Sequence, residues 1–217
     1  MIFNVSKGFS SLICCEYSGE NDVAKIIDFI CVFYTTLSNI YNDEMILTAK
    51  DIEKEVKKGN ITIDPFDKKC LKPNSYIYHL APKLIQILDV GDKRKKVKTK
   101  ELVIKERGLI LEPNKLYLGT TVEMIGSKKF VTSLIGRNKI GKLGMFLQIT
   151  ADLGQLGDAH KWTLEIKVVQ RLRIYPNMEI GQVTFWLPKG EIDIQETEFY
   201  AKQNEPYPSQ LYNEKTK

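Results

Sequence analysis

A single carboxylate, Glu165, stands out as a residue that could carry acid–base chemistry. It lies in the run Thr163-Leu164-Glu165-Ile166, in which polar and apolar residues alternate. Such alternation predicts a strand that turns Glu165 and Thr163 to one face and Leu164 and Ile166 to the other. A carboxylate shielded from water can take a proton from an attacking water and return it to a leaving group. The simpler alternative is a strand carboxylate that only faces solvent.

A basic residue, Arg137, is the second candidate. It belongs to the glycine-bounded run Gly136 to Gly144, which also holds Asn138 and Lys142. The planar fork of a guanidinium group matches the oxygens of a phosphate. Arg137 therefore indicates an anionic ligand, with a surface or subunit-interface salt bridge as the alternative.

Possible metal ligands are few. The chain has two histidines and four cysteines, namely His79, His160, Cys14, Cys15, Cys31 and Cys70. Zinc deaminases need a His or Cys beside a glutamate and a later Pro-Cys-x-x-Cys, and no two of these cysteines have that spacing. We expect no protein-bound zinc. The cysteines also lack the framework of a secreted disulfide scaffold and no signal peptide is evident, so we expect a cytoplasmic protein.

Charge and hydropathy name no polymer or membrane partner. The net charge of +5 comes from 32 basic and 27 acidic residues that are mixed along the chain, so we expect no nucleic-acid partner. The basic stretch from Asp92 to Lys100 has no interleaved aromatic residue and is predicted to be a solvated hairpin or loop rather than a phosphate site. The longest apolar segment, Ile26 to Tyr41, is interrupted by polar residues and too short to span a bilayer.

Many short strands and few helices are predicted. One amphipathic helix is expected from about Asp22 to Tyr41, and a second from Ala49 to Lys58, preceded by a capping-box pattern of Thr48 and Asp51. The strands are expected at Ile61 to Ile63, Tyr76 to Leu80, Leu84 to Leu88, Leu102 to Ile104, Leu109 to Leu111, Tyr117 to Leu118, Phe130 to Leu134, Met145 to Ile149, Trp162 to Val169 and Gln182 to Leu187. This pattern favours a mainly β fold, a distorted jelly-roll-like barrel with N-terminal helices.

Three parts of the chain are expected. Residues 1–44 form an N-terminal extension, residues 45–198 the β domain, and residues 199–217 a C-terminal tail. A chain of 217 residues with 43% hydrophobic residues is long enough for one such core domain with appendages.

The motifs resemble those of a known family. Nine runs carry this resemblance, namely Leu47 to Ile52, Ile63 to Asp67, Lys72 to Tyr76, Gly136 to Gly144, Thr150-Ala151, Thr163 to Ile166, Tyr175 to Gln182, Tyr200 to Gln203 and Pro206 to Ser209. In order and spacing they are similar to the dCTP deaminase branch of the trimeric dUTPase superfamily.

The resemblance implies a fold of the dUTPase-like type and an activity. The reaction would be hydrolytic, metal-independent deamination of dCTP to dUTP and ammonia, with Mg²⁺ bound only through the triphosphate. It also implies a homotrimer with sites between subunits. Glu165 would be the acid and base, and Asn138 and Lys142 would polarise the site. The nucleotide would be bound by Arg137, Ala151, Gln155, Tyr200, Lys202 and Gln203.

Some positions differ from the family pattern. Asn138 stands in place of a Ser, Lys142 in place of an Arg, and Gln155 in place of an Asp expected near the sugar. Phe199 stands where a phosphate-contacting Lys is usual. Ile77 and His79 replace an Asp and an Arg, and His79 is expected to be a satisfied strand histidine.

Two other functions remain open at this point. The same superfamily supports dUTP pyrophosphate hydrolysis, alone or after deamination, although Gln155 removes the carboxylate expected to activate water for attack on phosphate. The other alternative is a trimer that binds a nucleotide without turning it over.

Overall fold

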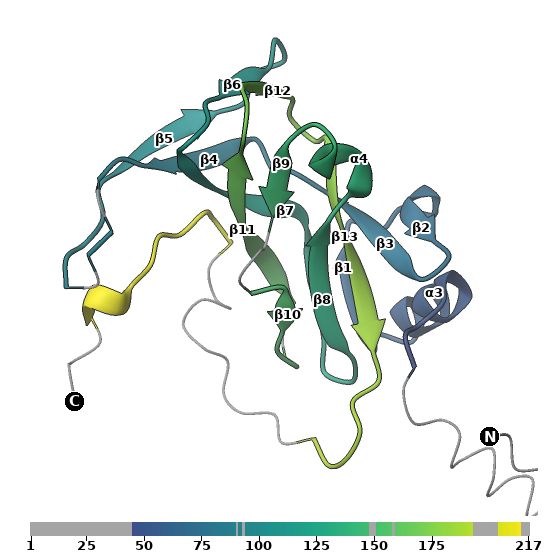
Figure 1. Ribbon diagram of the computed structural model, residues 1–217. Helices are drawn as coiled ribbons and strands as arrows, with labels where there is room; N and C mark the ends of the chain where they lie inside the picture. The colour runs from purple at the N-terminus through teal and green to yellow at the C-terminus, as the bar shows by residue number, and fades with distance from the viewer. Residues whose placement is uncertain are drawn as a thin grey trace, which may run out of the picture. The chain divides into compact units, whose positions relative to one another are not determined.

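A computed structural model describes residues 45–89, 91–92, 94–147, 151–157, 159–192 and 204–213. All of them belong to one unit of the chain, Glu44–Lys217. The expected helix from Asp22 to Tyr41, and with it the N-terminal extension, lies outside the described residues. The described unit is mainly β, as the sequence predicts (Figure 1).

Short strands make up most of this unit. Its helices are α3 (Ala49–Lys57) and α4 (Asn138–Gly141), with 3₁₀ turns η1 (Lys68–Cys70) and η3 (Leu211–Asn213). The strands are β1 (Ile61–Asp64), β2 (Leu71–Lys72), β3 (Ser75–His79), β4 (Lys83–Ile87), β5 (Thr99–Val103), β6 (Leu109–Leu111), β7 (Leu116–Ser127), β8 (Val131–Gly136), β9 (Met145–Leu147), β10 (Leu153–Gly154), β11 (His160–Val168), β12 (Leu172–Ile174) and β13 (Glu179–Trp186). None of the described helices is long and apolar enough to cross a membrane.

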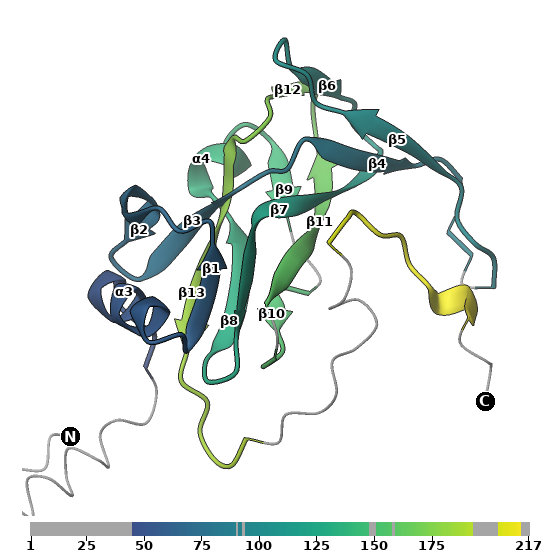
Figure 2. The same ribbon diagram turned by 180° about the vertical axis from the view of Figure 1, so that it is seen from behind.

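Two antiparallel sheets carry the fold. The first has the strand order β5-β4-β7-β11-β9, with β1 paired to the far end of β7, and the second has the order β10-β8-β13-β3-β2. Strands β6 and β12 form a separate two-stranded ribbon. Figure 2 shows β7, β11 and β1 as seen from the back of the unit. Each strand order among the described residues is an open path, so the predicted barrel is not closed by hydrogen bonds.

Strand β7 is much longer than predicted. The sequence indicates only Tyr117 and Leu118, because Thr120, Thr121 and Glu123 break the apolar run that follows. The structure extends the strand to Ser127 and buries all three of these polar side chains. Burial of Thr121 and Glu123 is tolerated because their side chains find partners: the Thr121 hydroxyl donates to the Glu123 carbonyl oxygen at 2.7 Å, and the Glu123 carboxylate accepts from the His79 backbone N–H at 2.9 Å. The long strand lets β7 pair with β4, β11 and β1.

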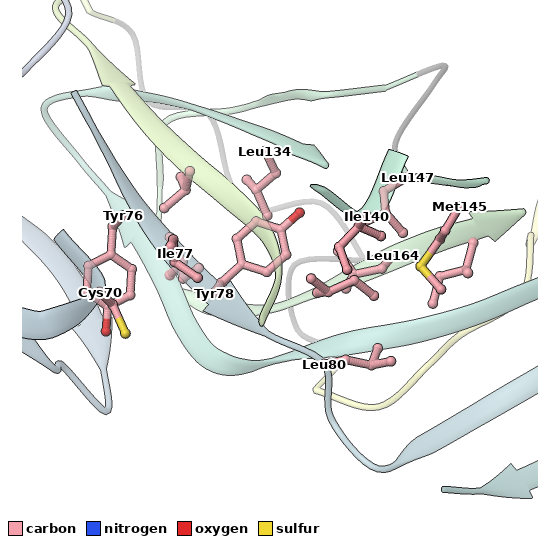
Figure 3. Packing of buried hydrophobic residues seen from close by; sticks show 14 of the residues in the cluster. Cys70, Tyr76, Ile77, Tyr78, Leu80, Leu134, Ile140, Met145, Leu147 and Leu164 are labelled. Atoms are coloured by element: carbon pink, nitrogen blue, oxygen red, sulfur yellow. The ribbon is translucent and has the colours of Figure 1, made fainter. Parts of the chain in front are cut away.

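A cluster of apolar side chains fills the space between the sheets. Figure 3 shows Tyr78 of β3 among Leu134, Ile140 and Leu164, with Cys70 beside the Tyr76 ring at one end. Burial raises the pKa of the Tyr78 hydroxyl, which donates to the Ile135 carbonyl oxygen at 3.2 Å. Both sheets therefore share one core.

Helix α3 forms where the sequence predicts it, but its first turn differs in detail. The Thr48 hydroxyl donates to the Asp51 carboxylate at 2.8 Å and makes no cap bond to the backbone. At the other end, the Glu55 carboxylate accepts hydrogen bonds from Lys58 at 2.8 Å and Asn60 at 2.6 Å. These bonds lower the pKa of Glu55 and fasten the helix to the start of β1.

Gly181 is predicted to be irreplaceable by alanine. It lies across from Tyr78, and an added Cβ would overlap the end of the buried Tyr78 ring. Gly181→Ala should lower the free energy of unfolding by about 1–3 kcal/mol, measured by urea denaturation. Gly141→Ala is the control, because nothing lies within 4 Å of a Cβ there. Equal stability of the two variants would contradict this packing.

Candidate active site

Glu165 lies on strand β11 and turns away from the core. Leu164 and Ile166 are buried on the side that faces the second sheet, and Glu165 between them is exposed. The predicted alternation is therefore confirmed. Because side chains alternate along a strand, the Glu165 carboxylate stands on the outer face of the first sheet.

The outer face around Glu165 is largely apolar. Glu165 lies across from Leu118 of β7, and Leu118 lies across from Ile85 of β4, so the three side chains share this face. Two residues further along β11, Lys167 is flanked by Phe146 of β9 and Leu116 of β7. Phe146 and Leu116 are each 43% exposed, which leaves apolar surface uncovered beside the carboxylate.

Arg137 lies at the junction of β8 and α4, in the second sheet. Its backbone N–H donates to the Ile180 carbonyl oxygen of β13 at 3.3 Å. Its guanidinium Nη1 donates to a carboxylate oxygen of Glu179, the first residue of β13. The salt-bridge alternative for Arg137 is thus realised within the chain, and the guanidinium keeps further donors for a ligand.

Asn138 and Lys142 lie at the two ends of the short helix α4. Asn138 is its first residue and Lys142 its C-cap, and both side chains are exposed. The Lys142 backbone N–H donates to the Asn138 carbonyl oxygen at 3.0 Å, so this one turn fixes their spacing. Their polar ends therefore lie near Arg137 on the surface of the second sheet.

Ala151 and Gln155 flank the short strand β10. The Leu134 backbone N–H donates to the Asp152 carbonyl oxygen at 2.8 Å, and Leu153 pairs with Ser133. Both contacts hold this segment along β8, where Ala151 and Gln155 are exposed. The structure thus brings Arg137, Asn138, Lys142, Ala151 and Gln155 to the second sheet.

Only part of the C-terminal tail lies within the described residues. Tyr200, Lys202 and Gln203, together with Phe199, lie outside the described residues. Beyond them, Asn204 accepts a hydrogen bond from the Lys161 backbone N–H at 3.0 Å, and Glu205 forms an ion pair with Lys83 at 3.1 Å. Lys83 lies two residues before Ile85 on β4, so the tail crosses the face that carries Glu165.

The two main candidates occupy different layers of one chain. Arg137 belongs to the second sheet, and Glu165 points from the first sheet in the direction away from it. A single ligand that touches both groups would need the Arg137 surface of one copy against the Glu165 face of another. Within one copy, the two groups therefore lie on different surfaces.

Sequence reasoning missed a buried carboxylate next to this region. The Glu123 side chain is 3% exposed and accepts hydrogen bonds from the His79 backbone N–H at 2.9 Å and from His79 Nδ1 at 2.5 Å. His79 also lies across from Glu179 in the pairing of β3 with β13. His79 is thus a satisfied strand histidine, as expected. Glu123 thus contacts His79, His79 lies across from Glu179, and Glu179 contacts Arg137. Only the pairing of the strands reveals this series of neighbours.

The comparison with family models decides the relationship. The model described as dCTP deaminase-like matches residues 46–187. The chain belongs to the dCTP deaminase family. The match covers the predicted β domain almost completely and includes every motif from β1 to β13.

Curated relatives of the family align over most of the chain. A protein named dCTP deaminase, dUMP-forming, from Clostridium beijerinckii is 41% identical over 171 residues, which are 78% of this chain and 98% of that protein. A protein of the same name from Hathewaya histolytica is 42% identical, with 78% and 99% covered. A dCTP deaminase from Rhodopirellula baltica is 39% identical, with 78% and 86% covered.

A solved structure confirms the fold of the family. The crystal structure of 2'-deoxycytidine 5'-triphosphate deaminase from Agrobacterium tumefaciens superposes with a TM-score of 0.55 at 15% identity. The superposition covers 67% of this chain and 49% of that chain, so it spans about half of the solved protein. The expected mainly β, dUTPase-like architecture is thereby confirmed.

Glu123 is predicted to be required for stability. Glu123→Ala would leave the partly buried His79 N–H without its acceptor and should lower the free energy of unfolding by about 2–3 kcal/mol. Glu101→Ala on the exposed strand β5 is the control and should stay within about 0.5 kcal/mol of the unchanged protein. Urea unfolding measures both. A loss at Glu123 no larger than at Glu101 would show that the pair does not hold the sheets together.

Proposed function

We propose that this protein deaminates dCTP by hydrolysis and acts in pyrimidine deoxynucleotide metabolism. The single observation that carries the proposal is the position of Glu165, an outward-facing carboxylate on the strand that bears the matching Thr163-Leu164-Glu165-Ile166 motif of a family to which the chain belongs. The names of the relatives support dCTP as the substrate.

Glu165 carries out both proton transfers of the reaction. Its carboxylate takes a proton from the water that attacks C4 of the cytosine ring, and the resulting carboxyl group gives a proton to the departing 4-amino group. Water and dCTP thus give dUTP and ammonia, and Glu165 returns to its starting form. Asn138 and Lys142 polarise the ring from the neighbouring subunit, while Ala151 leaves room for the attacking water.

Arg137 binds the phosphates, with Gln155, Tyr200, Lys202 and Gln203 as the other nucleotide contacts. The guanidinium fork supplies charge and two-point geometry to phosphate oxygens. Mg²⁺ prefers oxygen ligands and keeps much of its water, so it enters on the triphosphate. The ion screens the phosphate charge, and the protein's own residues do the proton transfer.

We place the active form, a homotrimer, in the cytoplasm, as the family resemblance implies. The two layers described above support contact between copies, because a ligand can touch both Arg137 and Glu165 only if one copy faces another. The exposed Phe146 and Leu116 beside Glu165 offer apolar surface for that contact. The same contact withdraws Glu165 from bulk water, which its acid–base role requires.

A second candidate is a bifunctional enzyme that also releases pyrophosphate. It is favoured by the dUMP-forming names of the Clostridium beijerinckii and Hathewaya histolytica relatives. It is opposed by Gln155, which cannot accept a proton from water as an Asp would. Deamination would come first, and a second water would then split dUTP into dUMP and pyrophosphate.

Glu165→Gln is predicted to abolish turnover while leaving nucleotide binding largely intact, because the amide keeps the size of the side chain and loses the proton transfer. The measurement incubates both proteins with dCTP, dCMP and dUTP plus Mg²⁺ and resolves nucleotides, pyrophosphate and ammonia by chromatography. Ammonia from the unchanged protein alone supports the assignment, and pyrophosphate with dUMP makes the enzyme bifunctional.

Two results would contradict this function. Full ammonia release by Glu165→Gln would remove Glu165 from the reaction. No product from any substrate, with the fold still stabilised against heat by nucleotide, would show a binding protein instead of an enzyme.

A further inference from the structure

Glu179 is placed by the sheet itself against Arg137. Strands β8 and β13 pair so that Gly136 lies across from Gly181, and the Arg137 N–H binds the Ile180 carbonyl oxygen at 3.3 Å. The residues that end one strand and begin the other are therefore neighbours. Glu179 contacts the Arg137 guanidinium, whose side chain is only 18% exposed, whereas that of Glu179 is 47% exposed.

The contact uses the chemistry that a phosphate would use. A carboxylate and a phosphate both offer anionic oxygen acceptors to a guanidinium fork. When Glu179 holds Arg137, a phosphate that takes the same donors must displace the carboxylate. Because Glu179 is half exposed, its side chain has solvent to move into, and Arg137 is the less mobile partner.

The surroundings of Glu179 add further negative charge. Glu179 lines a pocket of about 340 Å³ together with Asp67, Glu123, His79 and Lys69. Of the ten residues that line this pocket, three carry carboxylates and one, Lys69, carries a positive charge. A displaced Glu179 would therefore remain near the phosphates, and like charges at such distances repel. The repulsion grows with each negative charge that the ligand brings.

We propose that Glu179 sets the phosphate specificity of the nucleotide site, by competing for Arg137 and by penalising nucleotides with more phosphate charge. This inference rests on the proposed function, because it takes Arg137 as the phosphate contact. Glu179 is not a catalytic residue, since it acts through Arg137 and the local charge. Its effect is to weaken the affinity for the triphosphate substrate more than the affinity for a monophosphate.

The test measures binding of dCTP and dCMP by isothermal titration in buffer without Mg²⁺, so that the triphosphate keeps its larger negative charge. The full-length protein carries Glu165→Gln in every sample, so that no substrate is consumed, and is compared with and without Glu179→Gln. Removing the charge should tighten dCTP binding about fivefold, and dCMP binding by about twofold or less. The gain should shrink as salt rises, because screening weakens the repulsion.

Two control variants keep the result specific. Glu179→Asp retains the charge and should keep the weaker dCTP binding. Glu112→Gln breaks another ion pair between an arginine and a glutamate, in which Arg171 Nε and Glu112 Oε1 are 3.2 Å apart. Because this pair does not include Arg137, the substitution should change neither affinity.

Three outcomes would overturn the proposal. Equal affinities with and without Glu179→Gln would show that the carboxylate does not compete. Weaker binding of both nucleotides would show that Glu179 orients Arg137 for the ligand. No binding to any variant would remove the nucleotide site itself, and ammonia release from dCTP by the unchanged protein distinguishes that failure from a failure of the deaminase function.

Discussion

The two-residue period of strand β11 is the constraint on which the account of the site depends. Leu164 and Ile166 must face the core, because their burial joins the first sheet to the second. Because successive side chains of a strand point to opposite faces, Glu165 between them faces outward, away from the sheet that holds Arg137. A shift of one residue in register would bury the carboxylate and expose both apolar side chains. The core thus fixes where the acid–base group can act.

The second sheet gathers the other polar groups by pairing. Strand β13 lies between β8 and β3, so its first residue, Glu179, reaches Arg137 on one side and lies across from His79 on the other. His79 in turn is held by Glu123 from β7 of the first sheet. The region that would receive phosphate is therefore structurally tied to both sheets. The charged groups of this region therefore hold the sheets together in addition to facing the ligand.

The sequence predicts the alternating strands well and the long-range pairs poorly. Glu165 was recognisable because polar and apolar residues alternate around it, and helix α3 because a polar run ends at Gly59. The length of β7 was missed because Thr120, Thr121 and Glu123 resemble a loop until their buried partners are known. The Glu179 contact was missed for a related reason: residues 42 positions apart meet only through sheet register. Local pattern cannot supply that information.

We propose that Arg137 of one copy and Glu165 of another complete one site. To test this, Arg137→Ala and Glu165→Gln subunits are co-expressed under two affinity tags, and the mixed oligomers are assayed for ammonia release from dCTP. Each variant alone should be inactive or nearly so. In a shared-site trimer that contains both kinds of subunit, roughly one site in three combines an intact Arg137 with an intact Glu165, so the activity of mixed trimers should return to about a third of that of the unchanged protein. Mixed oligomers that stay as inactive as either variant alone would show that both residues serve one site within the same chain.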